Sequence, residues 1–351
     1  MPYSLAMSLT VLLASSVLSP SSAATAPRQS VQAMVAAMNK ANAAVVGVRT
    51  TAIDGARSIQ TLGRERTGSG VVIDSDGLIL TIGYLMLEAQ QIEIITQNNK
   101  TVPATPVAYD IATGFGLLRP LLPLRGITPV TLGSLQDLKP GEPLMAATGA
   151  TADGDEGDVS ITQLVSKRSF SGNWEYHIDT ALFTSPPITA GGGNHSGAPL
   201  FNSKGELVGI GSLLVGDATG KADASRRQPG NMFVPTDLLK PILAEMRQSG
   251  SSSKSHRPWL GLTSSDQGGR IQIMRVSAES PADEAGLQAG HIVLAVDGAE
   301  VTTLEDFYKK LWARANPDDT VTLTIGRGDE VKTIELKPQD RMLTLKKPAG
   351  I

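Results

Sequence analysis

One serine of this chain stands in a setting that could make it a nucleophile. Ser196 lies in the phrase NHSGAPLFNSKGELVGI, residues 194–210, inside a glycine turn that leads into a segment of strand-forming composition. Such a turn lifts the hydroxyl out of the backbone, and neighbouring amides can point at one spot where an oxyanion would form. Serines in glycine turns are also common in plain loops. The phrase therefore allows either an acyl-transfer site or a structural turn.

A serine nucleophile needs a base, and the candidates are few because the chain has 4 histidines. His195 adjoins Ser196, but neighbouring side chains on a turn diverge, which favours a local role in the turn. His177 lies in the alternating stretch WEYHIDTALF, predicted to be the strand before the serine loop. It is therefore either within reach of Ser196 or an exposed strand residue. His256 falls in a linker and His291 in a second domain, and no lysine lies in the serine loop.

Three phrases, in order and spacing, resemble the HtrA (high-temperature-requirement) family of serine proteases. The serine phrase resembles the family signature GNSGGPL, and residues 68–81, GSGVVIDSDGLILT, resemble the strand-turn-strand before the catalytic histidine. Residues 108–120, AYDIATGFGLLRP, resemble the phrase that carries the orienting aspartate. Residue by residue, however, Tyr84 stands at the histidine position and Gly114 at the aspartate position. The resemblance thus implies the family fold with a degenerate catalytic triad, in which Ser196 alone is retained.

The two replacements argue against turnover. A serine hydroxyl is a weak nucleophile unless a base takes its proton, and a phenol with an ordinary pKa of about 10 is itself protonated near neutral pH. Loss of the histidine or the serine of such a triad costs on the order of 10⁶ in turnover. We therefore interpret the chain as a pseudoprotease. The alternative is a weak serine endopeptidase that uses Ser196 with His177 or with a base supplied by a partner.

The approach to the serine also departs from the family. The run TAGGGNHSG, residues 189–197, is longer than the family approach, and Asn194 replaces the glycine whose amide helps to build the oxyanion hole. Glycine tolerates backbone angles there that other residues resist, although Asn resists them least. A phosphate-binding loop would need Gly-Lys-Ser/Thr at the start of a helix. Here Ala198 and Pro199 lead into a predicted strand instead.

Composition fits a folded, exported protein without a cofactor. The chain has 351 residues and no cysteine, so it can form no disulfide. Its formal net charge of −3 gives no reason to propose nucleic acid as a partner. Neither a metal site nor a cofactor site is predicted. Residues 1–24 have an apolar stretch, Leu5 to Leu18, and a small-residue cleavage site, as in a signal peptide. We expect export to the periplasm of a Gram-negative bacterium; the alternative is an uncleaved membrane anchor.

Residues 28–247 are predicted to form a mainly β domain. Eight or more short apolar runs alternate with glycine, proline and asparagine turns, among them VTLGS and NMFVPT, which is typical of an all-β barrel architecture. Together with the motifs, this pattern implies the trypsin-like double β-barrel. A helix in PTDLLKPILAEMRQSG is expected to close the domain, with Thr236 or Asp237 as its N-cap. Residues 248–257 have the polar composition of a flexible linker.

Residues 258–340 resemble the PDZ domain that follows the protease in HtrA proteins. A PDZ domain binds the end of an extended chain at an open strand edge, while loop amides bind the terminal carboxylate. The resemblance assigns the carboxylate loop to Trp259, Leu260, Gly261 and Leu262, and a helix to residues 303–312. The same loop residues could instead begin a buried strand. His291 stands at a turn position where the family has an aspartate, and residues 341–351 form a basic tail of unknown role.

The combined interpretation is an exported HtrA-like protein that binds unfolded or extended polypeptides and protein C-termini, as a scaffold, chaperone or adaptor. An active HtrA homologue is a further candidate partner. Many HtrA proteins form trimers through aromatic packing near the N-terminus of the barrel domain. This chain has no Phe, Trp or Tyr between Ala24 and Gly83, so a trimer stays only a possibility.

Overall fold

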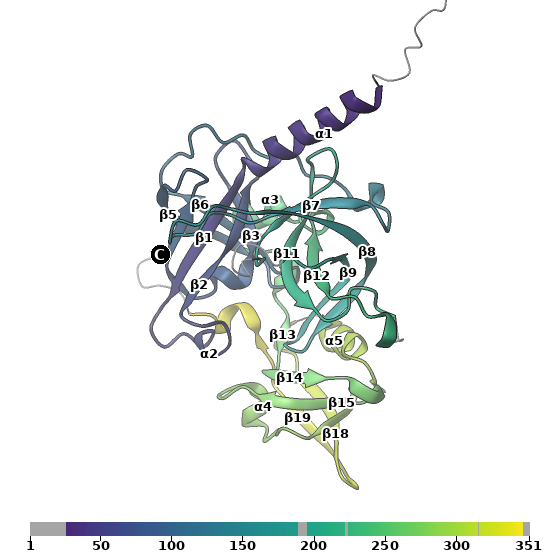
Figure 1. Cartoon of the computed structure of the whole chain (residues 1–351). Helices are drawn as coiled ribbons and strands as arrows, with labels where there is room; N and C mark the ends of the chain where they lie inside the picture. Colours follow the sequence, from purple (N-terminus) through teal and green to yellow (C-terminus); the bar gives the residue numbers. More distant parts are fainter. Residues whose placement is uncertain (1–25, 189–194, 222–223, 315, 347–351) are drawn as a thin grey trace, which may run out of the picture.

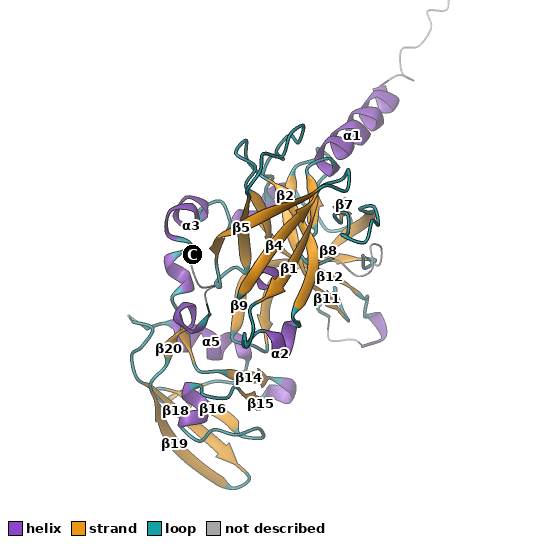
Figure 2. Ribbon diagram, turned by 90° about the vertical axis from the view of Figure 1, so that its left-hand side faces the viewer, coloured by secondary structure: helices purple, strands orange, loops and turns teal. Residues whose placement is uncertain are grey.

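The computed structural model describes residues 26–188, 195–221, 224–314 and 316–346. Figure 1 shows two β-barrels side by side, a smaller domain beneath them, and the helix α1 projecting from the opposite end. The view in Figure 2 has the same arrangement after a quarter turn. Within these ranges, no helix has both the length and the apolar character needed to span a membrane. The predicted signal peptide and Asn194 lie outside the described residues.

The first barrel is closed by six antiparallel strands in the order β1, β2, β3, β6, β5, β4. Helix α1 leads into it. Its elements are α1 (Ala26–Asn42), β1 (Val45–Ala52), α2 (Ile59–Leu62), β2 (Glu65–Val72), β3 (Ile79–Ile82), η2 (Gly83–Met86), β4 (Ala89–Ile95), β5 (Thr101–Tyr109) and β6 (Phe115–Pro120).

The second barrel has the same design, with the strand order β10, β11, β12, β9, β8, β7. Two six-stranded barrels confirm the predicted trypsin-like architecture. The elements are η3 (Leu135–Asp137), β7 (Pro143–Ala147), β8 (Val159–Gly172), β9 (Tyr176–Ser185), β10 (Pro199–Phe201), β11 (Leu207–Val215), η5 (Ala224–Arg226) and β12 (Gly230–Pro235).

Two local predictions for this domain are wrong. The run VTLGS, residues 130–134, forms no strand and contributes a single bridge from Leu132 to Leu207. The expected closing helix is split into a 3-10 turn, η6 (Thr236–Leu238), and a helix, α3 (Leu243–Ser249). Pro241 lies between them and cannot donate a backbone hydrogen bond, which accounts for the break. Asp237 is not the N-cap of this helix. Its carboxylate instead accepts the N–H of Leu135, 2.6 Å away, at the start of η3.

The smaller domain is built on the sheet β14, β15, β16, β18, β19, with β17 paired to β16. Its core is lined by apolar residues from the sheet and from α5, including the fully buried Phe307 and Tyr308. Thr303 caps α5 by accepting the N–H of Asp306 at 3.2 Å. The elements are β13 (Pro258–Trp259), β14 (Leu262–Ser265), η8 (Gln267–Gly269), β15 (Ile271–Val276), α4 (Pro281–Glu284), β16 (Ile292–Val296), β17 (Ala299–Glu300), α5 (Leu304–Trp312), β18 (Val321–Arg327), β19 (Glu330–Leu336), β20 (Gln339–Asp340) and η9 (Arg341–Thr344).

The segment predicted to be a flexible linker is ordered. It forms the 3-10 turn η7 (Ser253–Ser255), and Ser252 and Ser255 are fully buried. Both hydroxyls donate hydrogen bonds to the carboxylate of Asp110, at the end of β5. Asp110 is itself fully buried and also accepts the N–H of Thr113 at 2.8 Å. The linker is therefore attached to the first barrel, because its serine hydroxyls donate the hydrogen bonds that the buried Asp110 carboxylate needs.

The basic tail also returns to the barrels. Arg341, in η9, donates to the carbonyl oxygens of Trp174 and Glu175 at 3.1 and 3.0 Å. Farther along, the N–H of Lys346 donates to the Glu88 carboxylate in the first barrel at 3.1 Å. Thus the chain fastens the small domain to the barrels both before and after the domain itself.

We expect Asp110→Ala to lower the free energy of unfolding by about 2–4 kcal/mol, since it leaves several buried donors unsatisfied. The donors that lose their partner belong to Thr113, Ser252 and Ser255. Urea denaturation of the whole chain measures the change. The exposed Asp153→Ala serves as the matched control, with an expected effect within about 0.5 kcal/mol. Equal stability of the two variants would show that the buried carboxylate does not hold the linker.

Candidate functional site

The predicted catalytic positions come together where the two barrels meet. Tyr84 lies in η2, just after β3, and Ser196 lies in the turn before β10. The Tyr84 hydroxyl is 2.7 Å from the Ser196 hydroxyl and 2.7 Å from the carbonyl oxygen of Ser212. A carbonyl only accepts, so the single phenol hydrogen is donated to Ser212. Ser196 must then donate its own hydrogen to the tyrosine oxygen.

This arrangement holds the serine hydroxyl without activating it. Burial raises the pKa of Tyr84 to about 12, and the hydrogen bond with Ser196 offsets this only in part. A neutral phenol oxygen accepts a hydrogen bond but takes no proton from an alcohol at neutral pH. The contact between Tyr84 and Ser196 therefore has the position of a base and nucleophile pair without its chemistry.

Gly114 lies beside this pair and depends on being glycine. Its carbonyl oxygen accepts the N–H of Gly83 at 2.6 Å, next to Tyr84 in the chain. The φ angle of Gly114 is +87°, a value that side chains disfavour, and an added Cβ would lie 3.3 Å from the Tyr176 hydroxyl. That hydroxyl donates to the carbonyl oxygen of Thr113 at 2.7 Å. At the predicted aspartate position, a tyrosine hydroxyl and backbone groups therefore stand where a carboxylate would be.

The turn after the serine is fixed by a close backbone approach. Gly197 has a φ of +77°, and a Cβ there would lie 2.0 Å from the carbonyl oxygen of Ser69. The N–H of Ser69 donates to the Ser196 carbonyl at 2.8 Å. The first barrel thus clamps the serine turn of the second, which holds Ser196 against Tyr84. Asn194 and the glycine run before it lie outside the described residues.

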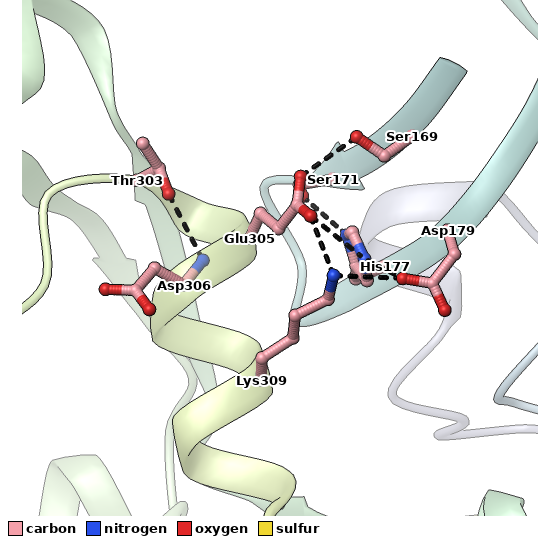
Figure 3. Close-up of polar contacts among 8 residues, drawn as sticks. All are labelled: Ser169, Ser171, His177, Asp179, Thr303, Glu305, Asp306 and Lys309. Carbon is pink, nitrogen blue, oxygen red and sulfur yellow. Dashed lines mark hydrogen bonds and ion pairs between the residues drawn. The ribbon is translucent and has the colours of Figure 1, made fainter. Parts of the chain in front are cut away.

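His177, the alternative base, has other partners. Its Nδ1 lies 2.9 Å from the Ser171 hydroxyl and its Nε2 lies 3.2 Å from Asp179, with Glu305 of α5 at 3.9 Å (Figure 3). Both ring nitrogens are therefore occupied at the interface with the small domain, away from Ser196. Two other histidines also have partners of their own: His256 bonds to Asp340 at 2.6 Å, and His291 caps a turn by accepting the N–H of Gln288 at 3.2 Å. His195 precedes Ser196 in the serine turn.

The polar cluster in Figure 3 has the composition of a metal site but already holds a cation. Ligand atoms of His177, Asp179 and Glu305 lie within 4.8 Å of one another. The Lys309 ammonium bonds to Asp179 at 3.0 Å and to Glu305 at 2.7 Å, from one turn farther along α5. We interpret the cluster as an ion-pair network that joins β9 to α5.

The predicted carboxylate loop of the small domain holds a carboxyl group of the chain itself. The N–H groups of Leu260 and Gly261 donate to the two side-chain oxygens of Glu175, at 3.0 and 3.4 Å. Glu175 belongs to the turn between β8 and β9, residues 173–175, which we call the β8/β9 turn. Trp259 lies in β13 and Leu262 begins β14, so the loop spans the gap between these two strands.

The β8/β9 turn also pairs with the strand that follows the loop. The N–H of Ser264 donates to the Asn173 carbonyl at 2.8 Å. From the other side, Tyr308 of α5 donates its hydroxyl hydrogen to the Gly172 carbonyl at 2.8 Å and accepts the N–H of Glu175 at 3.2 Å. The turn is therefore held between β14 and α5.

Comparison with known proteins agrees with both domains. Residues 68–210 match the family model of the trypsin-like peptidase domain, and residues 258–337 match that of the PDZ domain. The chain is 28% identical to serine protease PepD of Mycobacterium tuberculosis over 75% of its length, and it covers 58% of PepD. It is 26% identical to serine endoprotease DegS of Haemophilus influenzae, covering 74% of this chain and 73% of DegS.

Solved structures give the same fold. The HtrA-type protease AlgW with tripeptide superimposes with a TM-score of 0.52 at 20% identity, over 90% of this chain and 98% of AlgW. The serine endoprotease from Yersinia pestis gives 0.51 at 22% identity, over 88% and 97%. The chain is therefore similar to HtrA-type proteases. It carries a trypsin-like peptidase domain followed by a PDZ domain.

The sequence analysis did not identify Glu175 or Asp110 as a buried carboxyl group that joins the domains. Glu175 stands in a short polar turn, where a glutamate is ordinarily exposed, yet its side chain is buried and only 3% of the residue is accessible. Burial raises its pKa to about 7, although the nearby Arg341 and the loop amides favour the charged form. Asp110 offered one signal: an aspartate three residues before a threonine can cap a turn.

We expect the double variant Tyr84→His, Gly114→Asp to cleave casein no faster than the background rate. The imidazole would stand near Ser196, but an aspartate at position 114 would have to adopt a φ of +87° beside the Tyr176 hydroxyl. The lengthened serine loop would also remain unchanged. Release of labelled peptides from casein is the measurement, with each single variant as control. Ready cleavage by the double variant would contradict the argument from loop and backbone.

Docking of the β8/β9 turn should weaken as pH rises. The pKa of Glu175 is about 7 when docked, against an ordinary 4.5, so the docked state binds a proton more tightly than the open state. Docking is then strongest below about pH 4.5 and loses up to about 1.4 kcal/mol per pH unit until about pH 7. The charged and titratable groups that interact with Glu175 are Arg341 and Tyr308, beside the loop amides.

The opening free energy at the Ser264 amide, from hydrogen exchange corrected for intrinsic rates, measures this pH effect between pH 5 and 8. Glu175→Gln, which cannot ionise, should show a flat profile. The same slope in both proteins would assign the pH dependence to another group.

Proposed function

We propose that this chain is an exported HtrA-family pseudoprotease that binds extended polypeptides and protein C-termini without cleaving them. The observation that carries the proposal is the hydrogen bond between the Tyr84 and Ser196 hydroxyls at 2.7 Å. It puts a neutral phenol, with a pKa raised to about 12, in the place where the base of a serine protease would accept a proton.

The surroundings support the same conclusion. A protease base needs a third group to hold its orientation, and backbone carbonyl groups with the Tyr176 hydroxyl occupy that place. The second candidate, a weak endopeptidase that uses His177, is disfavoured because Ser171, Asp179 and Glu305 surround that imidazole. The Ser196 hydroxyl then has a structural role, as a donor that helps to hold the interface of the two barrels.

Peptide binding is assigned to the PDZ domain. Its loop presents the amides of Leu260 and Gly261 to a carboxyl group, and Ser264 of the neighbouring strand β14 donates its N–H to a backbone carbonyl of another segment. Both are the contacts by which PDZ domains capture chain ends. Solved structures of the HtrA-type protease AlgW contain a tripeptide or a decapeptide. By analogy, this chain would serve as a scaffold, chaperone or adaptor for such segments, alone or beside an active HtrA homologue.

The relatives and the N-terminal sequence support a periplasmic location. A periplasmic endoprotease of Halomonas elongata, described as DegP-like, is 27% identical over 79% of this chain, which covers 57% of that protein. Residues 1–24 have the composition of a signal peptide. We assign the protein to the periplasm and treat a trimer as an open possibility.

The test of the proposal is direct. Purified protein should not be labelled at Ser196 by a fluorophosphonate probe, and unfolded casein should stay intact over hours, because no base accepts the serine proton. An active HtrA protease under the same conditions is the positive control. Labelling that disappears in Ser196→Ala would refute the pseudoprotease assignment.

A further inference from the structure

The β8/β9 turn resembles a bound peptide in three respects. Its carboxyl group, on Glu175, receives the amides of Leu260 and Gly261 at 3.0 and 3.4 Å. Its backbone pairs with β14, where Ser264 donates to Asn173 at 2.8 Å. The turn runs toward the loop while β14 runs away from it, so the two segments are antiparallel. A captured chain end adds to the strand edge of a PDZ domain in this way.

We propose that the β8/β9 turn is an internal ligand of the PDZ groove, in which the Glu175 side chain takes the place of a peptide's terminal carboxylate. A free C-terminus then binds only when it displaces this turn. The inference rests on the proposed function, since it assigns regulation to the same groove.

The hairpin is shaped for this role. Strand β8 has 14 residues and β9 has 10, so they extend the hairpin from the second barrel to the small domain below it (Figure 1). Glu175 has a φ of +57°, a left-handed conformation that is uncommon for residues other than glycine, and this bend holds the carboxyl group at the loop. Such strain persists where the surrounding contacts fix the conformation. Tyr308 supplies such contacts at either end of the turn.

Further contacts around the turn strengthen the capture. The Arg341 guanidinium donates to the carbonyl oxygens of Trp174 and Glu175 from the segment after the PDZ domain. Beside the turn, Lys309 joins Asp179 of β9 to Glu305 of α5 (Figure 3). These bonds hold the turn near the groove, and a tethered ligand competes at an effective concentration in the millimolar range or above. A free peptide therefore has to overcome an internal competitor.

The competing partner is defined by the contacts that it replaces. It must present a carboxylate to the amides of Leu260 and Gly261 and a short extended segment to β14. A protein C-terminus supplies both from one chain end.

The experiment compares full-length variants for binding of one fluorescein-labelled decapeptide that ends in valine. The peptide is used with a free C-terminus and as the C-terminal amide, at pH 7.5, by fluorescence anisotropy. Glu175→Gln keeps the shape of the side chain and removes its charge, and Glu175→Ala removes the group. Glu156→Gln, on an exposed loop of the second barrel, is the matched control. Amide hydrogen exchange at Leu260 and Gly261 is measured for each protein without peptide.

We expect Glu175→Ala to bind the free-acid peptide at least tenfold more tightly than wild type and Glu156→Gln. Glu175→Gln, the neutral analogue of the protonated side chain that docks best, should bind it no more tightly than wild type. Exchange at the two loop amides should accelerate at least tenfold in Glu175→Ala, and the peptide amide should bind at least tenfold more weakly. Equal affinity and equal exchange in all proteins would overturn the internal ligand. Accelerated exchange with no peptide binding by any variant would support the internal ligand and overturn peptide capture as the proposed function.

Discussion

The arrangement of the two domains depends on one buried carboxylate. Asp110 directly follows the strand β5 of the first barrel. Its side chain is fully buried, so the carboxylate needs hydrogen bonds from the protein in place of water. Ser252 and Ser255, on the segment that leads to the PDZ domain, supply them together with Thr113. Burial alone would raise the pKa of Asp110, but these bonds lower it, so the group stays charged. Without this attachment the segment before the PDZ domain would lose its contact with the first barrel. The groove would then be held against the β8/β9 turn only by contacts from α5 and from the segment after the domain.

The region around Ser196 keeps the close packing of a trypsin-like site, although we propose that it does no proteolysis. Tyr84 reaches Ser196 at hydrogen-bonding distance, and Gly197 allows the first barrel to approach the serine turn closely. The packing of a catalytic centre is thus preserved around groups that cannot move a proton. A hydrogen bond between two neutral hydroxyls contributes about 1 kcal/mol to stability, so the Ser196 hydroxyl stabilises the fold independently of catalysis.

The amount that the sequence could predict differs between architecture and contacts. Alternating strands and glycine turns predicted an all-β barrel domain. The resemblance to the HtrA family implied the double barrel and the loop at residues 259–262 where a carboxyl group would bind. The run VTLGS failed because β propensity does not specify a partner strand. The linker failed because serines that look solvated became buried donors to Asp110. Each failure depends on a tertiary contact between residues far apart in the chain, which composition and local spacing do not encode.

Glu175 is the strongest example, since its carboxyl oxygens bind amides 85 and 86 residues away. Its neighbour Tyr176 donates to the carbonyl of Thr113, next to Gly114. Contacts therefore run from the PDZ loop through the hairpin to the pair of Tyr84 and Ser196. In an active protease such a route could carry peptide occupancy to the catalytic centre. In the pseudoprotease that we propose, the phenol is not a base near neutral pH, so displacement of the hairpin would have no turnover to change. Displacement of the hairpin would then determine only whether the PDZ groove is open or closed to a chain end.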